Sequence, residues 1–285
     1  MAQTNIAPSH PAAAPAGQTP PPAPLRKIFA SQFASRLAAA DTETVSISAG
    51  GVVPIYSTVT TIQTGSWVSI YGTNLAVADA TWTGNFPTNL GGTSVMINSR
   101  PAYLWFVSPG QINLQAPDDT ATGTVPVVVT TPTGTATSTV TLGQFGPSFN
   151  LLDSKHVAGI ILRSDGSGQY GGGSYDVIGP TGSSLGFPTV AARAGDTVEL
   201  FGVGFGATNP PVRSGQLFSG AAPTVNTVQI LIGGTSLTPA FAGLVEAGTF
   251  QFNLTIPAGL GTGDVSLVGL VGGVQTPSAA VISLQ

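Results

Sequence analysis

The side chains that could carry catalytic chemistry are few. The chain has 285 residues, two histidines (His10 and His156) and no cysteine. A hydrolase triad would have to use His156 as its base, with Asp153 or Asp165 nearby in the sequence to orient it. No Gly-x-Ser-x-Gly elbow, the turn that presents a nucleophilic serine, lies in a useful position. We therefore interpret His156 as an ordinary strand or loop residue and predict that the protein is not an enzyme.

The acidic residues offer two further places for chemistry. Asp118 and Asp119 follow a predicted strand, and paired carboxylates can hydrolyse glycosidic bonds. Asp165 and Asp176 flank a glycine-rich run, where carboxylate oxygens could bind calcium. The segment after Asp165 lacks the further acids that a calcium loop concentrates, so we expect solvated turn residues at both places. No cofactor is predicted, calcium is the one metal alternative left open, and the lack of cysteine excludes thiolate zinc sites.

Aromatic residues on polar loops give the sharper alternative for a binding site. Trp82 and Phe86 lie in one such loop, and Tyr170 and Tyr175 lie in the glycine-rich run. Rings of this kind stack on sugars or anchor protein interfaces. The competing interpretation is that these rings pack onto their own domain. The four residues are the candidate ligand or interface residues of the chain.

The elements that must position these side chains occur twice. The segment 65–75 (GSWVSIYGTNL) is similar to 195–206 (GDTVELFGVGFG), and 111–117 (QINLQAP) is similar to 251–257 (QFNLTIP). The spacing between the copies is about 130–140 residues, the size of a domain and not of a solenoid repeat. In each copy a strand runs into glycine, at Gly72 or Gly202, and we expect positive φ there. An apolar anchor, Leu75 or Phe205, should then return to the core.

Short β-rich segments bounded by Gly and Pro make up the rest of the chain from residue 42 onward. The predicted strands are 44–47, 52–62, 67–71, 95–97, 103–107, 112–115, 125–131, 135–142, 148–152, 157–162, 197–201, 228–232, 250–256, 265–271 and 279–284. Turn signals every 8–12 residues are typical of antiparallel sandwiches. Residues 1–41 form a Pro/Ala-rich tail followed by a short amphipathic helix pattern over 26–40. We predict one β-sandwich over 42–146 and a second over 147–285, which carries a Gly/Tyr-rich insertion at 164–176.

Composition narrows the partners. Charged residues are 7% of the chain, the net charge is −4, and the eight Lys and Arg residues are scattered. Nucleic acid is therefore not an expected partner, because binding to phosphates needs clustered cations. No apolar run reaches the roughly 20 residues of a membrane span, and no signal-peptide core is visible. Low charge with many Thr, Ser and Gly residues fits a secreted or surface protein.

The repeated strand–glycine–anchor element resembles the signature of IPT/TIG immunoglobulin-like domains. Longer stretches, 65–75, 90–95 (LGGTSV), 107–113 (VSPGQIN) and 259–265 (GLGTGDV), are similar to the Solibacter-type C-terminal domain family of Acidobacteria. The resemblance covers roughly residues 45–285. It implies a pair of extracellular immunoglobulin-like domains and brings no catalytic residues. Members often carry a large upstream region, where this chain has only a tail and a short helix.

These observations predict an all-β protein of two tandem immunoglobulin-like (IPT/TIG-like) sandwiches. The expected function is a non-enzymatic structural or adhesion module of a bacterial surface or secreted protein. Its partners would be other surface proteins, a glycan, or further copies of itself joined through strand edges or into a filament. The alternative is a carbohydrate-binding module that uses loop aromatics.

Overall fold

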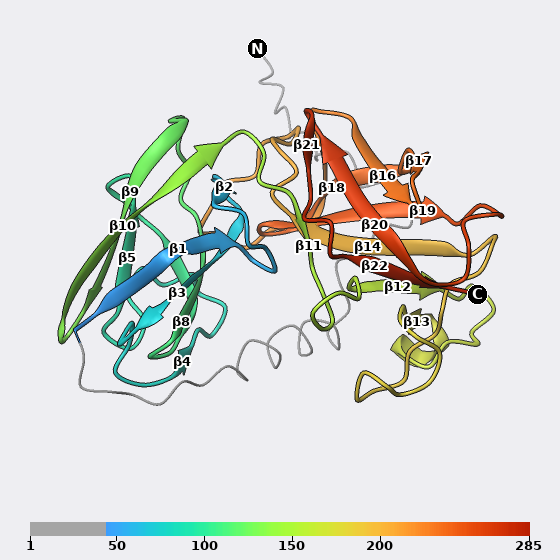
Figure 1. Cartoon of the computed structure of the whole chain (residues 1–285), viewed down its shortest axis with the longest axis horizontal. Helices are drawn as coiled ribbons and strands as arrows, with labels where there is room; N and C mark the ends of the chain where they lie inside the picture. Colours follow the sequence, from blue (N-terminus) through green and yellow to red (C-terminus); the bar gives the residue numbers. More distant parts are fainter. Residues whose placement is uncertain (1–43) are drawn as a thin grey trace, which may run out of the picture.

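A computed structural model describes residues 44–285, which form two β-rich lobes lying side by side (Figure 1). The N-terminal lobe (residues 44–146) contains strands β1 to β10, and the C-terminal lobe (residues 147–285) contains β11 to β22. In this part of the chain no strand pairing joins the two sets. Over residues 44–285 one short 3-10 helix, η1 (Gly171–Gly173), interrupts the otherwise all-β structure.

Two five-stranded sheets build the N-terminal lobe. The first has the order β1-β3-β8-β7-β4 and the second β2-β10-β9-β5-β6. Neighbouring strands are antiparallel, except that β2 runs parallel to β10. The strands are β1 (Ser46–Pro54), β2 (Thr61–Gln63), β3 (Trp67–Thr73), β4 (Ala80–Thr81), β5 (Ser94–Ile97), β6 (Arg100–Pro101), β7 (Tyr103–Val107), β8 (Gln111–Gln115), β9 (Gly123–Thr131) and β10 (Gly134–Gly143).

The C-terminal lobe also has two sheets. One has the order β13-β12-β14-β19-β18-β15 with β11 on β14, and the other β17-β16-β20-β21 with β22 on β20. The strands are β11 (Ser148–Phe149), β12 (Gly159–Leu162), β13 (Tyr175–Val177), β14 (Thr197–Val203), β15 (Ser219–Pro223), β16 (Val228–Ile232), β17 (Thr235–Leu237), β18 (Phe241–Glu246), β19 (Thr249–Thr255), β20 (Gly263–Val271), β21 (Val274–Gln275) and β22 (Val281–Leu284).

Each lobe has its own core between its two sheets. In the N-terminal lobe Ile70 and Leu114 from one sheet meet Val127 and Leu142 from the other. In the C-terminal lobe Phe252 belongs to the equivalent cluster. The alternation of inward apolar and outward side chains along the strands produces this separation. The structure is thus all-β, with several sheets arranged as in immunoglobulin-like sandwiches.

The repeated turn differs from its expected geometry in one respect. Positive φ falls on Asn74 (53°) and Gly204 (78°), not on Gly72 or Gly202. Gly72 is needed for another reason, because a Cβ there would collide with the Ser46 carbonyl oxygen on the neighbouring strand. A Cβ on Gly202 would lie 2.7 Å from the equivalent oxygen of Ser148. The expectation for the anchors is confirmed, since Leu75 and Phe205 are both fully buried.

Most predicted strands are present, with shifted ends. The expected strand 228–232 coincides with β16. The expected run 52–62 is broken, because β1 ends at Pro54 and a turn precedes β2. Strand β18 was not predicted, although it lies between β19 and β15. The tail 1–41 and the amphipathic pattern over 26–40 lie outside the described residues.

Candidate functional site: the junction between the lobes

An aromatic cluster lies where the two lobes meet. Trp67, the first residue of β3, is 8% exposed and packs with Ile55 and Phe86 of its own lobe and with Val203 and Ala247 of the other. Its indole Nε1 donates a 2.8 Å hydrogen bond to the backbone carbonyl of Ala247. A buried indole needs such a partner for its N–H. Trp67 therefore joins the lobes through both apolar contact and a specific hydrogen bond.

Trp82 and Phe86, two of the predicted loop aromatics, pack against this cluster. Phe86 is 7% exposed and Trp82 is half-buried. The rings of Trp82 and Phe86 lie edge to face with centroids 4.5 Å apart. Trp82 also meets Trp67 edge to face at 5.8 Å. These geometries are the preferred ones for aromatic pairs, so both rings contribute to the packing of the junction.

Three polar contacts cross the junction beside the aromatic cluster. The Gln63 side-chain oxygen accepts a 2.7 Å hydrogen bond from the backbone N–H of Gly206. The Gln115 side-chain oxygen accepts one of 2.9 Å from the N–H of Gly215. In the third contact, Asp118 Oδ1 accepts from both the N–H (3.1 Å) and the Oγ (2.8 Å) of Ser214. The loop 206–215 thus binds the N-terminal lobe through the last residues of β2 and β8, Gln63 and Gln115, and through Asp118 just after β8.

Glycines allow the two backbones to approach at this surface. Gly248 has φ +68°, and a Cβ on it would lie 2.8 Å from the Trp67 ring and 3.0 Å from the Gly65 carbonyl oxygen. Gly215 has φ +75°, and a Cβ there would collide with the Tyr103 ring. Both positions need a residue that tolerates positive φ and has no side chain. The sequence is therefore fitted to close contact between the lobes.

Tyr170 and Tyr175, the other predicted aromatics, lie in the glycine-rich insertion. Their rings stack at 5.8 Å, and Tyr175 is 6% exposed. The Tyr170 hydroxyl donates a 3.1 Å hydrogen bond to the Pro188 carbonyl. Burial raises the pKa of both hydroxyls above the ordinary tyrosine value. The insertion uses both rings in its own packing, away from Trp82 and Phe86.

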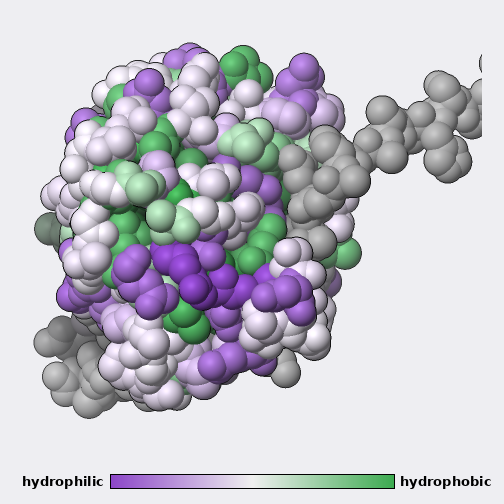
Figure 2. Space-filling view, turned by 90° about the vertical axis from the view of Figure 1, so that its right-hand side faces the viewer, coloured by the Kyte–Doolittle hydropathy of each residue, from purple (hydrophilic) through white to green (hydrophobic). Residues whose placement is uncertain are grey.

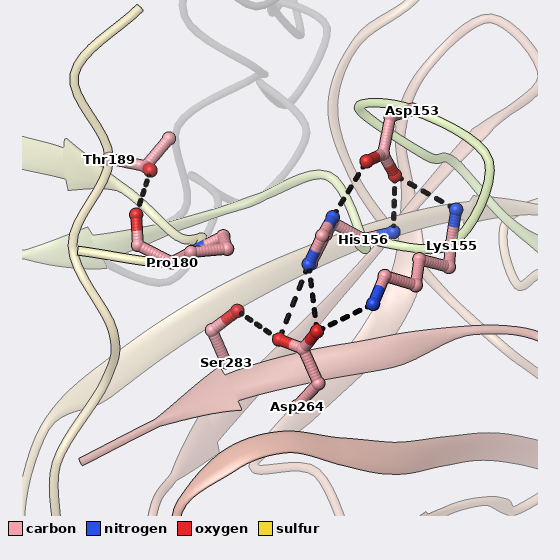
Figure 3. Close-up of polar contacts among 7 residues, drawn as sticks. All are labelled: Asp153, Lys155, His156, Pro180, Thr189, Asp264 and Ser283. Carbon is pink, nitrogen blue, oxygen red and sulfur yellow. Dashed lines mark hydrogen bonds and ion pairs between the residues drawn. The ribbon is translucent and has the colours of Figure 1, made fainter. Parts of the chain in front are cut away.

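His156 lies between two carboxylates in the C-terminal lobe (Figure 3). Its Nδ1 is 2.8 Å from Asp153 Oδ2, and its Nε2 is 3.2 Å from Asp264 Oδ2. Both ring nitrogens of His156 therefore face carboxylate oxygens. Lys155 Nζ also contacts Asp264, at 2.7 Å, and Ser283 Oγ donates to its other oxygen at 3.0 Å. The cluster joins the turn at 153–156 to strands β20 and β22.

This cluster does not have the arrangement of a hydrolase triad. The hydroxyl of Ser283 donates to Asp264 and not to a His156 nitrogen, and both nitrogens already face carboxylates. Neither nitrogen of His156 contacts the Ser283 hydroxyl, as the base of a triad would contact its serine. The Gly-Ser-Ser-Leu-Gly run at 182–186 lies in a loop and not on a turn from strand to helix. Within residues 44–285 the histidine therefore serves to cross-link the lobe.

Hydrogen bonds and charges set the pKa values of the two carboxyl groups. The Lys155 hydrogen bond is the largest cause that lowers the pKa of Asp264, with Ser283 and His156 adding to it against some desolvation. Burial alone would raise the pKa of Asp153, but the N–H groups of His156 and Lys155 outweigh it and lower that pKa. Both carboxylates are therefore stabilised in their charged form.

The other acidic candidates make local contacts. Asp165 Oδ1 accepts from the N–H and Oγ of Ser167, and Asp176 Oδ2 accepts from Arg163 Nε at 2.8 Å. The neighbouring carboxylates Asp118 and Asp119 have different partners. Asp119 Oδ2 lies 3.3 Å from Arg100 Nε, whereas Asp118 binds Ser214. Across residues 44–285 no three His, Asp or Glu side chains gather as a metal site.

A second Arg163 contact, from its Nη1 to Asp196 at 3.0 Å, completes a chain of ion pairs at the end of the C-terminal lobe away from the junction. Arg163 and the two carboxylates it binds, Asp176 and Asp196, are each about a tenth exposed. Figure 2 views this end, where hydrophilic residues form a band across an otherwise mixed surface. Arg163 thus fastens the strand β13 and the turn before β14 to the end of β12.

The repeat also preserves a buried polar pair. Gln111 Nε2 donates to Asn113 Oδ1 on β8, and Gln251 Nε2 to Asn253 Oδ1 on β19, each at 2.8 Å. The two lobes differ on the strand that pairs with each Asn. Ser69 of β3 is paired with Asn113, and Glu199 of β14 is paired with Asn253. Glu199 is 1% exposed, and burial raises its pKa to about 7, against a lowering by Gln251.

Several junction and cluster residues were not singled out from the sequence. The predicted strands contain or adjoin Trp67, Gln63 and Gln115. Their hydrogen-bond partners lie 100 to 180 residues further along the chain, so no local pattern indicates the contacts. Asp264 is likewise 108 residues from His156. The repeated Gln-x-Asn pattern was the one sequence feature that could have indicated functional residues, and in the structure it occupies buried strand positions.

Comparison with known proteins supports the immunoglobulin-like assignment for part of the chain. The IPT/TIG domain model matches residues 52–145, which lie entirely within the N-terminal lobe. No curated protein matches the sequence. Among residues 44–285, no helix is long and apolar enough to cross a membrane.

Solved structures give distant likenesses. The Plexin A4 extracellular region is 10% identical with a TM-score of 0.28, over 88% of this chain and 20% of that one. SGBP-B from the mixed-linkage glucan utilization locus of Bacteroides ovatus, solved with a mixed-linkage heptasaccharide, is 12% identical with a TM-score of 0.33. That match covers 87% of this chain and 46% of the other. The chain therefore spans less than half the length of both.

Proposed function

We propose that the chain is a non-enzymatic structural or interaction module of a bacterial surface or secreted protein, built of two tandem immunoglobulin-like domains that act as one rigid unit. The observation that carries this proposal is the junction. A tryptophan hydrogen bond, an aromatic cluster and three polar contacts join the lobes. Lobes joined in this way hold a fixed spacing between their outer ends, which suits a spacer or a presenting scaffold.

The tandem assignment is supported by the repetition of strand order. The order β3-β8-β7-β4 in the N-terminal lobe is matched by β14-β19-β18-β15 in the C-terminal lobe. The IPT/TIG match covers the first of these sets. The resemblance of segments in both lobes to the Solibacter-type family supports the same domain class for the second. We place the domain boundary at 146/147.

Non-enzymatic function is supported by the use of the reactive side chains. His156 holds two carboxylates, and Asp118, Asp165 and Asp176 are each bonded to neighbouring groups. IPT/TIG domains are typically interaction modules, which agrees with this use. Other surface proteins are therefore the proposed partners, at the outer ends of the rigid unit.

Assembly through strand edges receives little support from the edges themselves. β4, β6 and β21 have two residues each, and β13 and β17 have three. The long edge strand β1 is interrupted by an irregularity between Ile47 and Val52. Short and bulged edges are the devices by which β-proteins prevent edge-to-edge pairing. We therefore propose that the module is monomeric and not a filament subunit.

A sugar platform built from the four predicted aromatics is also little supported. Phe86 and Tyr175 are buried. The rings of Trp82 and Tyr170 pack on their neighbours. A platform needs an open ring face.

Three measurements test the proposal. Protease treatment of intact producing cells, followed by immunoblotting, should remove the protein if it is exposed at the surface. Sedimentation velocity of the full chain should give one monomeric species at all concentrations. Ester and glycoside substrates should not be turned over. Turnover that disappears in His156→Ala, or a protein confined to the cell interior, would contradict the proposal.

A further inference from the structure

A pocket of about 410 Å³ opens at the junction of the lobes. Its size lies within the range of about 300–1,000 Å³ that is usual for ligand sites, and domain junctions are a preferred place for such sites. Gln63, Ser66 and Gln115 line it from the N-terminal lobe, and Val212, Leu244 and Phe250 from the C-terminal lobe. Neither lobe forms the pocket alone.

The polar groups of the pocket are held in place by the junction contacts. Gln63 uses its side-chain oxygen to bind Gly206, so its amide nitrogen is the group that can donate to a ligand. Asp118 uses Oδ1 for Ser214, which leaves Oδ2 as an acceptor. The amides of Gln144 and Asn226 are exposed. The wall thus offers two polar side chains, Gln63 and Asp118, held in place by hydrogen bonds, and two exposed amides that can pair with a polar ligand.

Apolar surface lies between these groups. Phe145 is half-buried, with its ring between Gly206 and Gly272, and the buried side chains of Phe250 and Leu244 also line the pocket. A mixture of ring and aliphatic surface with a few oriented polar groups is typical of small-molecule sites. It suits a ligand that has both C–H faces and hydroxyl groups.

Charge narrows the class of ligand. No Lys or Arg among the described residues lines the pocket, and Asp118 is its one carboxylate. An anionic ligand would therefore meet repulsion without compensation. An extended peptide strand is disfavoured as well, because the loop backbone is already paired: Val225 N–H donates to Ala207, and Asn209 N–H to Pro223. Strand addition needs open backbone groups.

We infer that this pocket binds a neutral, hydroxyl-rich ligand, namely one or two sugar units of an uncharged glycan. The amide side chains would pair with hydroxyl groups, and the ring and aliphatic surface would meet the C–H face of the sugar. The site differs from the four aromatic residues predicted from the sequence. It is also independent of the proposed structural function, which would stand if the pocket bound nothing.

Isothermal titration of the full chain with cellotetraose, maltotetraose, xylotetraose, mannotetraose and tetragalacturonate tests this inference. We expect at least one of the four neutral sugars to bind, and tetragalacturonate to bind at least about tenfold more weakly. Asn226→Trp, which places a large ring at an exposed residue that lines the pocket, should abolish binding. Gln275→Trp, an exposed residue on β21 of the same lobe, is the matched control and should leave binding unchanged.

Three results would overturn the inference. The first is no binding by any neutral sugar at about 10 mM, where even a weak site would be occupied. The second is tighter binding of the uronate than of the neutral sugars. The third is binding that survives Asn226→Trp, which would locate the sugar elsewhere. Thermal melts of both variants check that the fold is intact.

Discussion

The indole N–H of Trp67 donates a 2.8 Å hydrogen bond to the backbone carbonyl of Ala247, a residue 180 positions further along the chain. This contact links the start of β3 in one lobe to the turn between β18 and β19 in the other. It lies among buried aromatic rings, where an unpaired N–H or carbonyl would cost about 1–3 kcal/mol. The joint between the lobes therefore favours one geometry.

Substitution of Trp67 should weaken the junction in two steps. Trp67→Phe keeps a ring but loses the hydrogen bond, and we expect a loss of about 1–2 kcal/mol in the free energy of unfolding. Trp67→Ala also leaves a cavity and should cost about 3–5 kcal/mol. Urea unfolding measures both. Val77→Ala, at a side chain that is 64% exposed, is the control and should stay within about 0.5 kcal/mol of the wild type.

Gly248→Ala should lower the free energy of unfolding by more than the strain of a positive φ alone would cause. A Cβ at Gly248 meets the Trp67 ring at 2.8 Å, in addition to the cost of positive φ. Gly234→Ala has a similar φ, +82°, with no atom within 4 Å of the added Cβ, so it isolates the backbone cost. We expect Gly248→Ala to be about 1–2 kcal/mol less stable than Gly234→Ala. Equal losses in calorimetry would show that the lobes are not in close contact there.

Removing the charge of Asp264 should change how the free energy of unfolding depends on pH in the acid range. Its pKa is lowered in the folded protein, chiefly by Lys155, so its stabilising effect is present above the unfolded pKa of about 4 and is lost as the pH falls through the lower folded value. Asp264→Asn should therefore be less stable than the wild type at pH 7, with a difference that shrinks below about pH 4. Urea titrations of both proteins at several pH values from 7 to below about 4 measure this difference in the free energy of unfolding. Asp79→Asn, an exposed carboxylate in the other lobe, controls for the loss of one negative charge.

Glu199 should behave in the opposite sense. Burial raises its folded pKa to about 7, so the folded state binds a proton that the unfolded state has released above about pH 4.3. Wild-type stability should fall as the pH rises from about 4.3 to 7, by up to about 3 kcal/mol from this group. Glu199→Gln should then be more stable than the wild type at pH 8, with a difference that fades near pH 4. A difference that stayed constant across this range would contradict the assignment.

The strands were largely predictable because their signals are local. β-branched residues and flanking turns predict β16 and most of its neighbours. β18 was missed because Ala242 and Gly243 weaken the pattern, although the strand is held between two others. At the repeated turn the expected positive φ at Gly72 was wrong, and glycine is needed there because the Ser46 carbonyl oxygen approaches it closely.

The junction could not be read from the sequence in the same way. Whether Phe86 lies in solvent or in a cluster depends on Ala247 and Val203, which only the folded chain brings near. The role of His156 likewise depends on Asp264, which is distant in sequence. The aromatic types were visible, but the surfaces that cover them arise from contacts between the lobes.

A distance measurement between the lobes tests the central claim most directly. The chain has no cysteine, so Thr137→Cys on β10 and Gln229→Cys on β16 would place two spin labels at exposed sites, one in each lobe. Pulsed electron resonance should give a single narrow distance distribution, and adding Trp67→Ala should broaden it. A broad or multiple distribution in the protein with intact Trp67 would show that the lobes move independently, and would contradict the rigid module proposed above.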